Sequence, residues 1–253
     1  MSGIFTGVGV GPGDPELMTL KAVRATEACS VIAIPVSADT LEKPVYEHAG
    51  DKSNAVYLER CVAYRIAAGA VRGIGEKDRL YLPMPMIKEK DRLKVVHERD
   101  AAAVAELLDQ GKNVVFLTLG DPTVYSTCMY VHKRLKRDGY TTRVVPGIPS
   151  FCAAAARMDI PLVENRQELH VLPASYHIEE SLDLPGTKVL MKAGRQMAEV
   201  KRLLTEKGLD SVMVENCGME NEKLYFGAQE IPEQAGYYSL LVVKERQTGG
   251  ENV

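Results

Sequence analysis

The fold is decided by residues 4–35, which read IFTGVGVGPGDPELMTLKAVRATEACSVIAIP. The segment begins with a short β-type run at residues 4–10, which ends in a glycine-rich turn. Thr19 then stands where a helix N-cap is expected, and the apolar residues behind it recur at helical spacing. A second apolar run at residues 30–35 follows at once, as a buried parallel strand does after a helical crossover. This succession predicts a β-α-β unit and an α/β fold.

The alternation of strands and helices continues along the chain. Glycine and proline interrupt residues 37–75, where the pattern predicts no definite element. We expect two α/β domains, at residues 1–118 and 119–246, and a tail at residues 247–253. Apolar runs predict strands at residues 79–82, 114–119, 143–145, 169–172, 188–191, 211–214 and 238–243. Helical spacing predicts helices at residues 88–110, from 128 to the stop at Gly139, at 151–158 and at 196–207.

The composition excludes several classes of protein. The 253 residues suffice for two domains, and 31 Lys and Arg against 34 Asp and Glu give a net charge of −3, so no nucleic-acid partner is expected. No segment reaches the roughly 18 apolar residues of a membrane span, and the first residues do not form a signal peptide. The 5 cysteines are scattered and read as reduced core thiols. We therefore expect a cytoplasmic protein.

The glycine-rich turn is the first candidate binding loop. Its glycines at positions 7, 9, 11 and 13 fit neither the GxGxxG frame of dinucleotide-binding proteins nor a Walker loop. Asp14 and Glu16 follow, and the nearest cation in the sequence is Lys21, so a polyanion would be repelled. The loop suits a ligand that is neutral, zwitterionic or cationic at this point. The alternative is a tight turn that only joins a strand to a helix.

Two later loops repeat this arrangement at the ends of predicted strands. Residues 120–123 read GDPT, and residues 145–150 read VPGIPS. Because ligands of open α/β sheets bind beyond the carboxyl ends of the strands, three such loops predict one shared crevice. Asp121 is the candidate functional side chain there. Stabilisation of its own turn is the competing interpretation.

Four motifs together resemble the tetrapyrrole methylases that use S-adenosylmethionine. They are GVGVGPGDPELMTLKA at residues 7–22, FLTLGDPTVYST at 116–127, VVPGIPSF at 144–151 and YYSLLVVKE at 237–245. Within that superfamily they look most like the precorrin-2 and cobalt-factor II C20-methyltransferases of cobalamin (vitamin B12) biosynthesis. The resemblance implies a homodimer of two-domain subunits, with the active site in the trough between the two domains.

The resemblance also implies that S-adenosylmethionine is held largely by backbone groups. In similar enzymes a threonine usually stands where this chain has Pro149, so the resemblance supports a backbone contact there and not a side-chain hydrogen bond. Carried over by motif position, the donor-binding residues are Pro12, Leu119, Gly120, Asp121, Val124, Pro149, Ser150, Met191, Lys192, Asn216 and Cys217.

Methyl transfer from a sulfonium to carbon needs alignment of the reactants more than it needs a metal or a catalytic triad. Neither is visible in the sequence, and no metal is predicted. We expect the Asp121 loop and Tyr238 to shape the site around the C20 carbon. Basic residues that could anchor the substrate carboxylates are Arg60, Arg65, Arg72, Lys88 and Lys90, with solvated surface charge as the alternative. Tyr81, Met84 and Met86 could line the macrocycle or belong to the core.

Four other functions compete with this interpretation. The nearest is methylation of another tetrapyrrole position, in uroporphyrinogen III or a later precorrin. Ribosomal RNA methylation is disfavoured by the lack of a basic surplus. A dinucleotide-dependent oxidoreductase is disfavoured by the broken GxGxxG frame. A non-catalytic ligand-binding protein would carry the same motifs.

Overall fold

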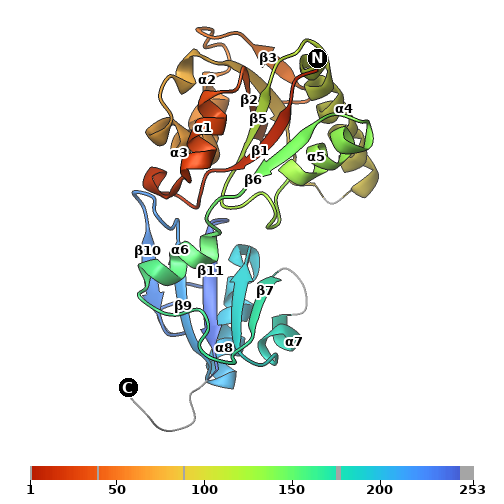
Figure 1. Cartoon of the computed structure of the whole chain (residues 1–253). Helices are drawn as coiled ribbons and strands as arrows, with labels where there is room; N and C mark the ends of the chain where they lie inside the picture. The colour runs from red at the N-terminus through yellow and green to blue at the C-terminus, as the bar shows by residue number, and fades with distance from the viewer. Residues whose placement is uncertain (1, 39, 88, 175–177, 246–253) are drawn as a thin grey trace. The chain divides into compact units, whose positions relative to one another are not determined.

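The computed structural model describes residues 2–38, 40–87, 89–174 and 178–245 (Figure 1). The chain divides into two compact units, Met1–Pro149 and Ser150–Val253. Within the described ranges, no helix is both long and apolar enough to cross a membrane. The predicted tail at residues 247–253 lies outside the described residues.

The first unit is built on a six-stranded sheet with the order β3-β4-β2-β5-β1-β6. All neighbouring strands pair in parallel except β3, which runs antiparallel to β4 at one edge. The parallel arrangement brings the carboxyl ends of five strands to the same edge of the sheet. The strands are β1 (Phe5–Gly9), β2 (Val31–Val36), β3 (Val45–Glu47), β4 (Asp78–Pro83), β5 (Val114–Thr118) and β6 (Thr142–Val145).

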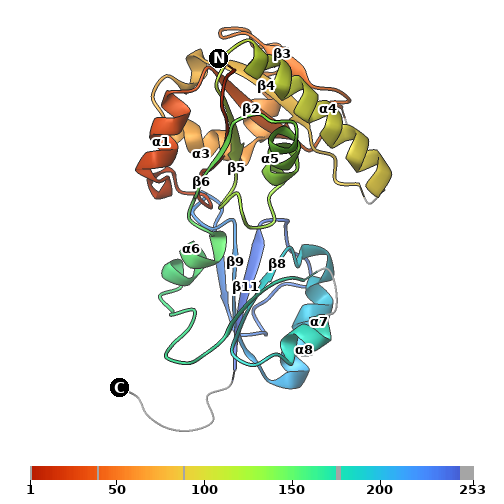
Figure 2. The ribbon, with the colours of Figure 1, turned by 45° about the vertical axis from the view of Figure 1, so that its right-hand side comes forward.

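Helices cover both faces of this sheet, so its central strands are mostly apolar. The long helix α4 packs beside α5 on one face, and α1 and α3 lie on the other (Figure 2). Thr19 caps α1 as predicted, because its side chain accepts a hydrogen bond from the Ala22 N–H at 3.1 Å. The helices are α1 (Leu20–Glu27), α2 (Ala55–Arg60), α3 (Val62–Ala70), α4 (Lys90–Asp109) and α5 (Cys128–Arg137), with 3-10 turns η1 (Pro15–Leu17) and η2 (Ile74–Glu76).

The second unit contains a five-stranded sheet with the order β10-β9-β11-β8-β7. Only β7 and β8 pair in parallel. Side chains alternate between the two faces, one packed against α6 and the other against α7 and α8. The elements are α6 (Ser150–Arg157), β7 (Leu169–Pro173), α7 (Ile178–Leu182), β8 (Thr187–Met191), η3 (Gly194–Gln196), α8 (Met197–Lys207), β9 (Asp210–Glu215), β10 (Lys223–Phe226) and β11 (Ser239–Lys244).

The boundary between the units differs from the one predicted at residues 118 and 119. The strand β6 lies well beyond that point in the sequence, yet it pairs with β1 at the edge of the first sheet. The helix α5 packs against the same sheet. The first unit therefore extends to Pro149, because one β-α-β crossover beyond β5 still belongs to it.

A buried polar network orders the region where the sequence predicted no element. Glu47 on β3 accepts hydrogen bonds from Arg79 at 3.1 Å and from Tyr81 at 2.7 Å, and its other oxygen accepts two from Asn54, at 2.9 and 3.0 Å. Arg79 also donates to the backbone carbonyls of Asp51 and Gly75. These contacts hold the connection that contains α2 and α3 against the sheet.

The cysteine prediction is confirmed for three of the five residues. Cys29, Cys61 and Cys128 are buried free thiols, whereas Cys152 is exposed and Cys217 is half-buried. The expectation that all five lie in the core is wrong for the last two. The small helix α6 buries its alanine side and turns Cys152 outward.

Candidate functional site

The three loops that the sequence singled out meet at the carboxyl edge of the first sheet. They follow β1, β5 and β6, which are adjacent strands. The loops after β1 and β5 are joined by an antiparallel bridge between Gly11 and Gly120. Gly120 N–H donates to the Gly11 carbonyl at 2.8 Å, and Gly11 N–H donates to the Gly120 carbonyl at 3.3 Å. The predicted convergence of these loops is therefore present in the structure.

The loops approach so closely that side chains cannot fit between them. A Cβ atom on Gly9 would lie 2.5 Å from the Gly120 carbonyl oxygen and 2.6 Å from the Gly147 nitrogen. A Cβ atom on Gly147 would lie 2.2 Å from the same carbonyl oxygen. Backbone contact of this kind explains the glycines better than a phosphate-binding motif does.

Asp121 links two of these loops through its carboxylate. The side chain is 7% exposed. Its Oδ2 atom accepts a hydrogen bond from the Gly147 N–H at 3.0 Å, and Oδ1 accepts one from the Thr123 N–H at 2.8 Å. Both carboxylate oxygens therefore bind backbone N–H groups. This geometry favours the interpretation that Asp121 stabilises the loops over a role as a proton acceptor.

The first loop is acidic, and a capped 3-10 turn follows it. Asp14 accepts a hydrogen bond from the Glu16 N–H at 2.8 Å and so caps the turn η1. Pro12 and Gly13 are buried, while the Glu16 side chain is exposed. The negative charge predicted here is thus present beside the glycine turn, as a cationic ligand group would require.

The remaining predicted residues of the first unit surround these loops. Leu119 and Val124 are half-buried on either side of Asp121, and Pro149 is half-buried at the end of the loop after β6. The sequence did not single out Tyr125, which is 47% exposed and has a φ of 48°. A left-handed backbone is unusual for an aromatic residue and often marks a functional loop. Its place in the quoted motif at residues 116–127 was its signal in the sequence.

The predicted residues of the second unit gather at one edge of its sheet. β8 and β9 end at this edge, and the antiparallel strand β11 begins there. Met191 pairs with Leu240, and the Asn216 N–H donates to the Tyr238 carbonyl at 3.0 Å. Met191, Lys192, Asn216, Cys217 and Tyr238 are therefore neighbours at this edge.

Two of these residues have a left-handed backbone. Lys192 directly after β8 has a φ of 61°, and Asn216 directly after β9 has a φ of 52°. Asparagine tolerates this conformation, but lysine adopts it at a cost in free energy. Two such residues at one edge of the sheet, on the strands that flank β11, indicate that the local backbone shape matters more than its intrinsic stability.

An aromatic pair lies beside them. The rings of Tyr237 and Tyr238 are 5.3 Å apart with an interplanar angle of 83°. The two residues are 50% and 39% exposed. Tyr238 was expected here from the sequence and Tyr237 was not, although both belong to the motif at residues 237–245. Half-exposed aromatic faces of this kind can contact a planar ligand.

The residues proposed to contact the substrate separate into two groups. Tyr81 is fully buried and donates to Glu47, and Met84 is buried in the core of the first unit, so neither lines a macrocycle. Met86 is 61% exposed beyond the end of β4. Lys88 lies outside the described residues. The other basic candidates are exposed and make no ion pair with described residues: Arg60, Arg65, Arg72 and Lys90.

The His, Cys, Asp and Glu side chains do not form a metal centre in the described parts of the chain. No group of three or more His, Cys, Asp or Glu residues there has the arrangement that could hold a metal ion. Burial, together with the nearby Glu222 carboxylate, raises the pKa of the Cys217 thiol to about 11, so this thiol is protonated at neutral pH. The first unit therefore offers backbone groups and an acidic loop, and the second unit offers aromatic faces.

Curated relatives match the chain over almost its entire length. A probable cobalt-precorrin-2 C(20)-methyltransferase of Methanocaldococcus jannaschii is 34% identical over 241 residues, covering 94% of each chain. A precorrin-2 C(20)-methyltransferase of a Sinorhizobium species is 31% identical over 262 residues, covering 96% of this chain and 97% of the relative.

Solved structures share the fold at lower sequence identity. A cobalt precorrin-4 methyltransferase superposes with a TM-score of 0.67 at 17% identity, covering 95% of this chain and 94% of the other. A uroporphyrin-III C-methyl transferase of Thermus thermophilus, complexed with S-adenyl homocysteine, superposes with a TM-score of 0.64 at 22% identity, covering 96% and 98%. The model of the tetrapyrrole (corrin/porphyrin) methylases matches residues 5–231. The chain therefore belongs to the tetrapyrrole methylase family.

Proposed function

We propose that the protein transfers a methyl group from S-adenosylmethionine to the C20 meso carbon of precorrin-2 or cobalt-factor II in cobalamin biosynthesis. The observation that carries this proposal is the near full-length similarity to relatives named as C20-methyltransferases, at 34% and 31% identity. A uroporphyrinogen-III C-methyltransferase of Pseudomonas aeruginosa is 29% identical over 88% of the chain, so methylation of that substrate is the second candidate.

The donor would be held by the loops at the two sheet edges. We assign this role to Pro12, Leu119, Gly120, Asp121, Val124, Pro149 and Ser150 in the first unit, and to Met191, Lys192, Asn216 and Cys217 in the second. The acidic first loop suits the positive sulfonium, and the closely packed glycines leave backbone groups as the contacts.

The chain's own contribution to the reaction is alignment. S-adenosylmethionine supplies an activated methyl group, and positioning two reactants can lower a barrier by about 7–11 kcal/mol. Asp121 holds the loops after β5 and β6 in fixed relation, which keeps the donor-binding backbone rigid. In this role Asp121 is a positioning residue. Loss of a proton from C20 restores conjugation in the product.

Tyr238 and Tyr237 would contact the acceptor. Their edge-to-face rings give an aromatic surface next to Asn216. The substrate carries several carboxylates, and the exposed residues Arg60, Arg65, Arg72 and Lys90 are candidates to bind them. Tyr238→Phe should keep at least half of the activity, whereas Tyr238→Ala should raise the KM for the tetrapyrrole several-fold.

The reaction can be tested by an anaerobic incubation with methyl-labelled S-adenosylmethionine and reduced precorrin-2, with and without cobalt. Mass spectrometry and NMR locate the label. Transfer to C20 is the expected result, and the two arms identify the preferred metal state. Label at another carbon would contradict the C20 assignment. Transfer in a parallel incubation with uroporphyrinogen III, without transfer to precorrin-2, would support the second candidate.

We further propose that the enzyme is a homodimer that works in the cytoplasm. Sedimentation equilibrium of the full chain should give twice the 27.8 kDa of one subunit. Fractionation of source cells, with the protein detected by antibody, should place it with the cytosolic markers.

A further inference from the structure

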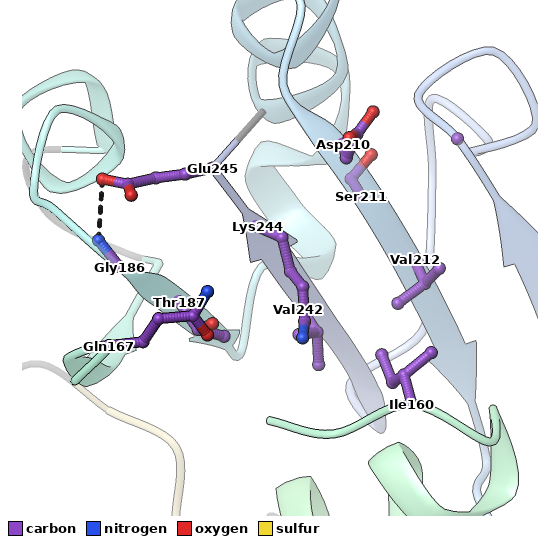
Figure 3. Close-up of a pocket in the computed structure, with 11 residues that line it drawn as sticks. Ile160, Gln167, Gly186, Thr187, Asp210, Ser211, Val212, Val242, Lys244 and Glu245 are labelled. Carbon is purple, nitrogen blue, oxygen red and sulfur yellow. Dashed lines mark hydrogen bonds between the residues drawn. The ribbon is translucent and has the colours of Figure 1, made fainter. Parts of the chain in front are cut away.

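A pocket in the second unit lies away from the proposed donor-binding edge. It occupies the opposite end of the same sheet, on the face that packs against α6 (Figure 3). β8 begins at the pocket with Thr187 and ends at Met191. β11 begins beside Tyr238 and ends at the pocket with Lys244. The proposed reaction uses none of the pocket residues, although Val242, Lys244 and Glu245 belong to the motif at residues 237–245.

The pocket is lined by an apolar wall, one lysine and the carboxylates of Asp210 and Glu245. Ile160, Val212 and Val242 form the apolar wall, and Val212 and Val242 are paired residues on neighbouring strands. Figure 3 shows the Lys244 side chain running along the sheet past Val242. The amine of Lys244 therefore lies beside hydrocarbon side chains on one side of the cavity.

The carboxylates nearest to Lys244 in the sequence and in the sheet do not neutralise it. Asp210, its pairing partner, is exposed, and Glu245 accepts a hydrogen bond from the Gly186 N–H at 2.8 Å (Figure 3). Among the residues that the structure describes, Lys244 makes no ion pair within 4.0 Å and no side-chain hydrogen bond. A cation beside an apolar wall attracts an anion more strongly than one in open solvent.

The size of the pocket limits the ligand. Its volume is about 260 Å³, just below the roughly 300–1,000 Å³ of sites for drug-sized ligands. An inorganic anion would leave the apolar wall in contact with water, and an apolar molecule would leave the amine unpaired. A short hydrocarbon body with one carboxylate satisfies both surfaces.

We propose that this pocket binds a small organic monocarboxylate, with its carboxylate on Lys244 and its hydrocarbon body against Ile160, Val212 and Val242. Thr187 and Gln167, which also line the pocket, supply polar groups close to the carboxylate end. The proposal is independent of the methyl-transfer reaction, because no residue of the pocket belongs to the proposed donor or acceptor sites.

The test uses hexanoate as the probe and the full chain labelled with ¹³C at valine methyl groups. Saturating S-adenosylhomocysteine is present throughout, so that binding at the donor site does not contribute. We expect saturable shifts of the Val212 and Val242 methyl signals. Hexylamine and 1-hexanol, which have the same hydrocarbon chain, should bind at least tenfold more weakly.

Variants of Lys244 separate the ion pair from simple partitioning into an apolar site. Lys244→Met should weaken hexanoate binding at least tenfold, and Lys244→Arg should keep it within a few-fold. Lys223→Met, which removes an exposed lysine from β10 in the same unit, is the matched control and should leave binding unchanged. Hexanoate shifts that do not saturate, or that survive Lys244→Met unchanged, would overturn the proposal.

Discussion

The Oδ2 atom of Asp121 accepts a hydrogen bond from the backbone N–H of Gly147 at 3.0 Å, although the two residues belong to loops that follow different strands. The Oδ1 atom meanwhile accepts the N–H of Thr123 in its own loop. One buried carboxylate thus fixes both the turn after β5 and the position of the loop after β6.

Asp121→Asn should weaken donor binding without creating a new pH dependence. An asparagine offers one acceptor oxygen, so one of the two backbone N–H groups faces an amide NH₂. Hydrogen bonds to charged groups contribute about 1.5–3 kcal/mol, so we expect the Kd for S-adenosylhomocysteine to rise roughly tenfold or more. Calorimetric titration measures this change.

The pH profile distinguishes positioning from proton transfer. If Asp121 positions the loops, the variant keeps the pH dependence of kcat seen in the unmodified enzyme. A lost limb in that profile, together with an unchanged Kd for S-adenosylhomocysteine, would instead identify Asp121 as a general base. Asp138→Asn is a suitable control, because Asp138 is exposed and pairs only with Arg137 among the described residues.

Gly147→Ala should disrupt the same contact by changing the residue that donates to Asp121. The added methyl group would lie 2.2 Å from the Gly120 carbonyl oxygen, so a loop must move. We expect a loss of about 1–3 kcal/mol in the free energy of unfolding and weaker binding of S-adenosylhomocysteine. Gly75→Ala is the control, since nothing lies within 4 Å of its added Cβ atom. Equal effects of the two substitutions would show that the close approach is unimportant.

The sequence predicted the loops at this site better than the partners they bind. A short β-type run located β1, and apolar runs located β2 and β5, all within one residue, because a strand buried on both faces favours apolar side chains at most positions. The position of Asp121 at the end of β5 followed from the same run. Its hydrogen bond to Gly147 did not, because no local pattern reveals which strand lies beside β1.

The region around β3, α2 and α3 escaped prediction for a different reason. Its order depends on Glu47, Arg79 and Tyr81, which form a buried network between segments distant in the sequence. Polar residues at such spacing carry no periodic signal. The boundary at Pro149 was missed for the same reason, since the sequence of neither strand alone shows that β6 pairs with β1.

Asn216→Gly tests whether this residue contributes a backbone shape or a side chain. Glycine adopts the observed φ of 52° without strain, so the free energy of unfolding should stay within about 0.5 kcal/mol and donor affinity should be kept. Asn216→Val should lose about 1–2 kcal/mol, because a β-branched residue fits this conformation poorly.

Thermal unfolding and titration with S-adenosylhomocysteine measure both properties of the Asn216 variants. A large loss of affinity in Asn216→Gly with normal stability would show that the side-chain amide binds the donor directly. In the structure this amide donates to the Asn221 carbonyl at 3.4 Å, a long contact whose loss should cost little.

Asp100 on α4 should make the first unit less stable as the pH rises. Its side chain is 0% exposed, and neither carboxylate oxygen has a hydrogen-bond partner among the described residues. Burial raises the pKa of this carboxyl from 3.8 to about 7, while Arg99 and Arg134 oppose the shift. The folded state therefore binds the proton more tightly than the unfolded state does.

The stabilisation by this proton is complete below about pH 4 and is lost as the pH rises to about 7. A shift of about three pKa units corresponds to roughly 4 kcal/mol. Asp100→Asn keeps a neutral side chain of the same shape at every pH, so its unfolding free energy should fall less between pH 5 and pH 8. Hydrogen–deuterium exchange of the α4 amides measures the difference. Asp91→Asn, at an exposed position of the same helix, should follow the unmodified protein. Parallel slopes for all three proteins would mean that Asp100 is already ionised in the folded state.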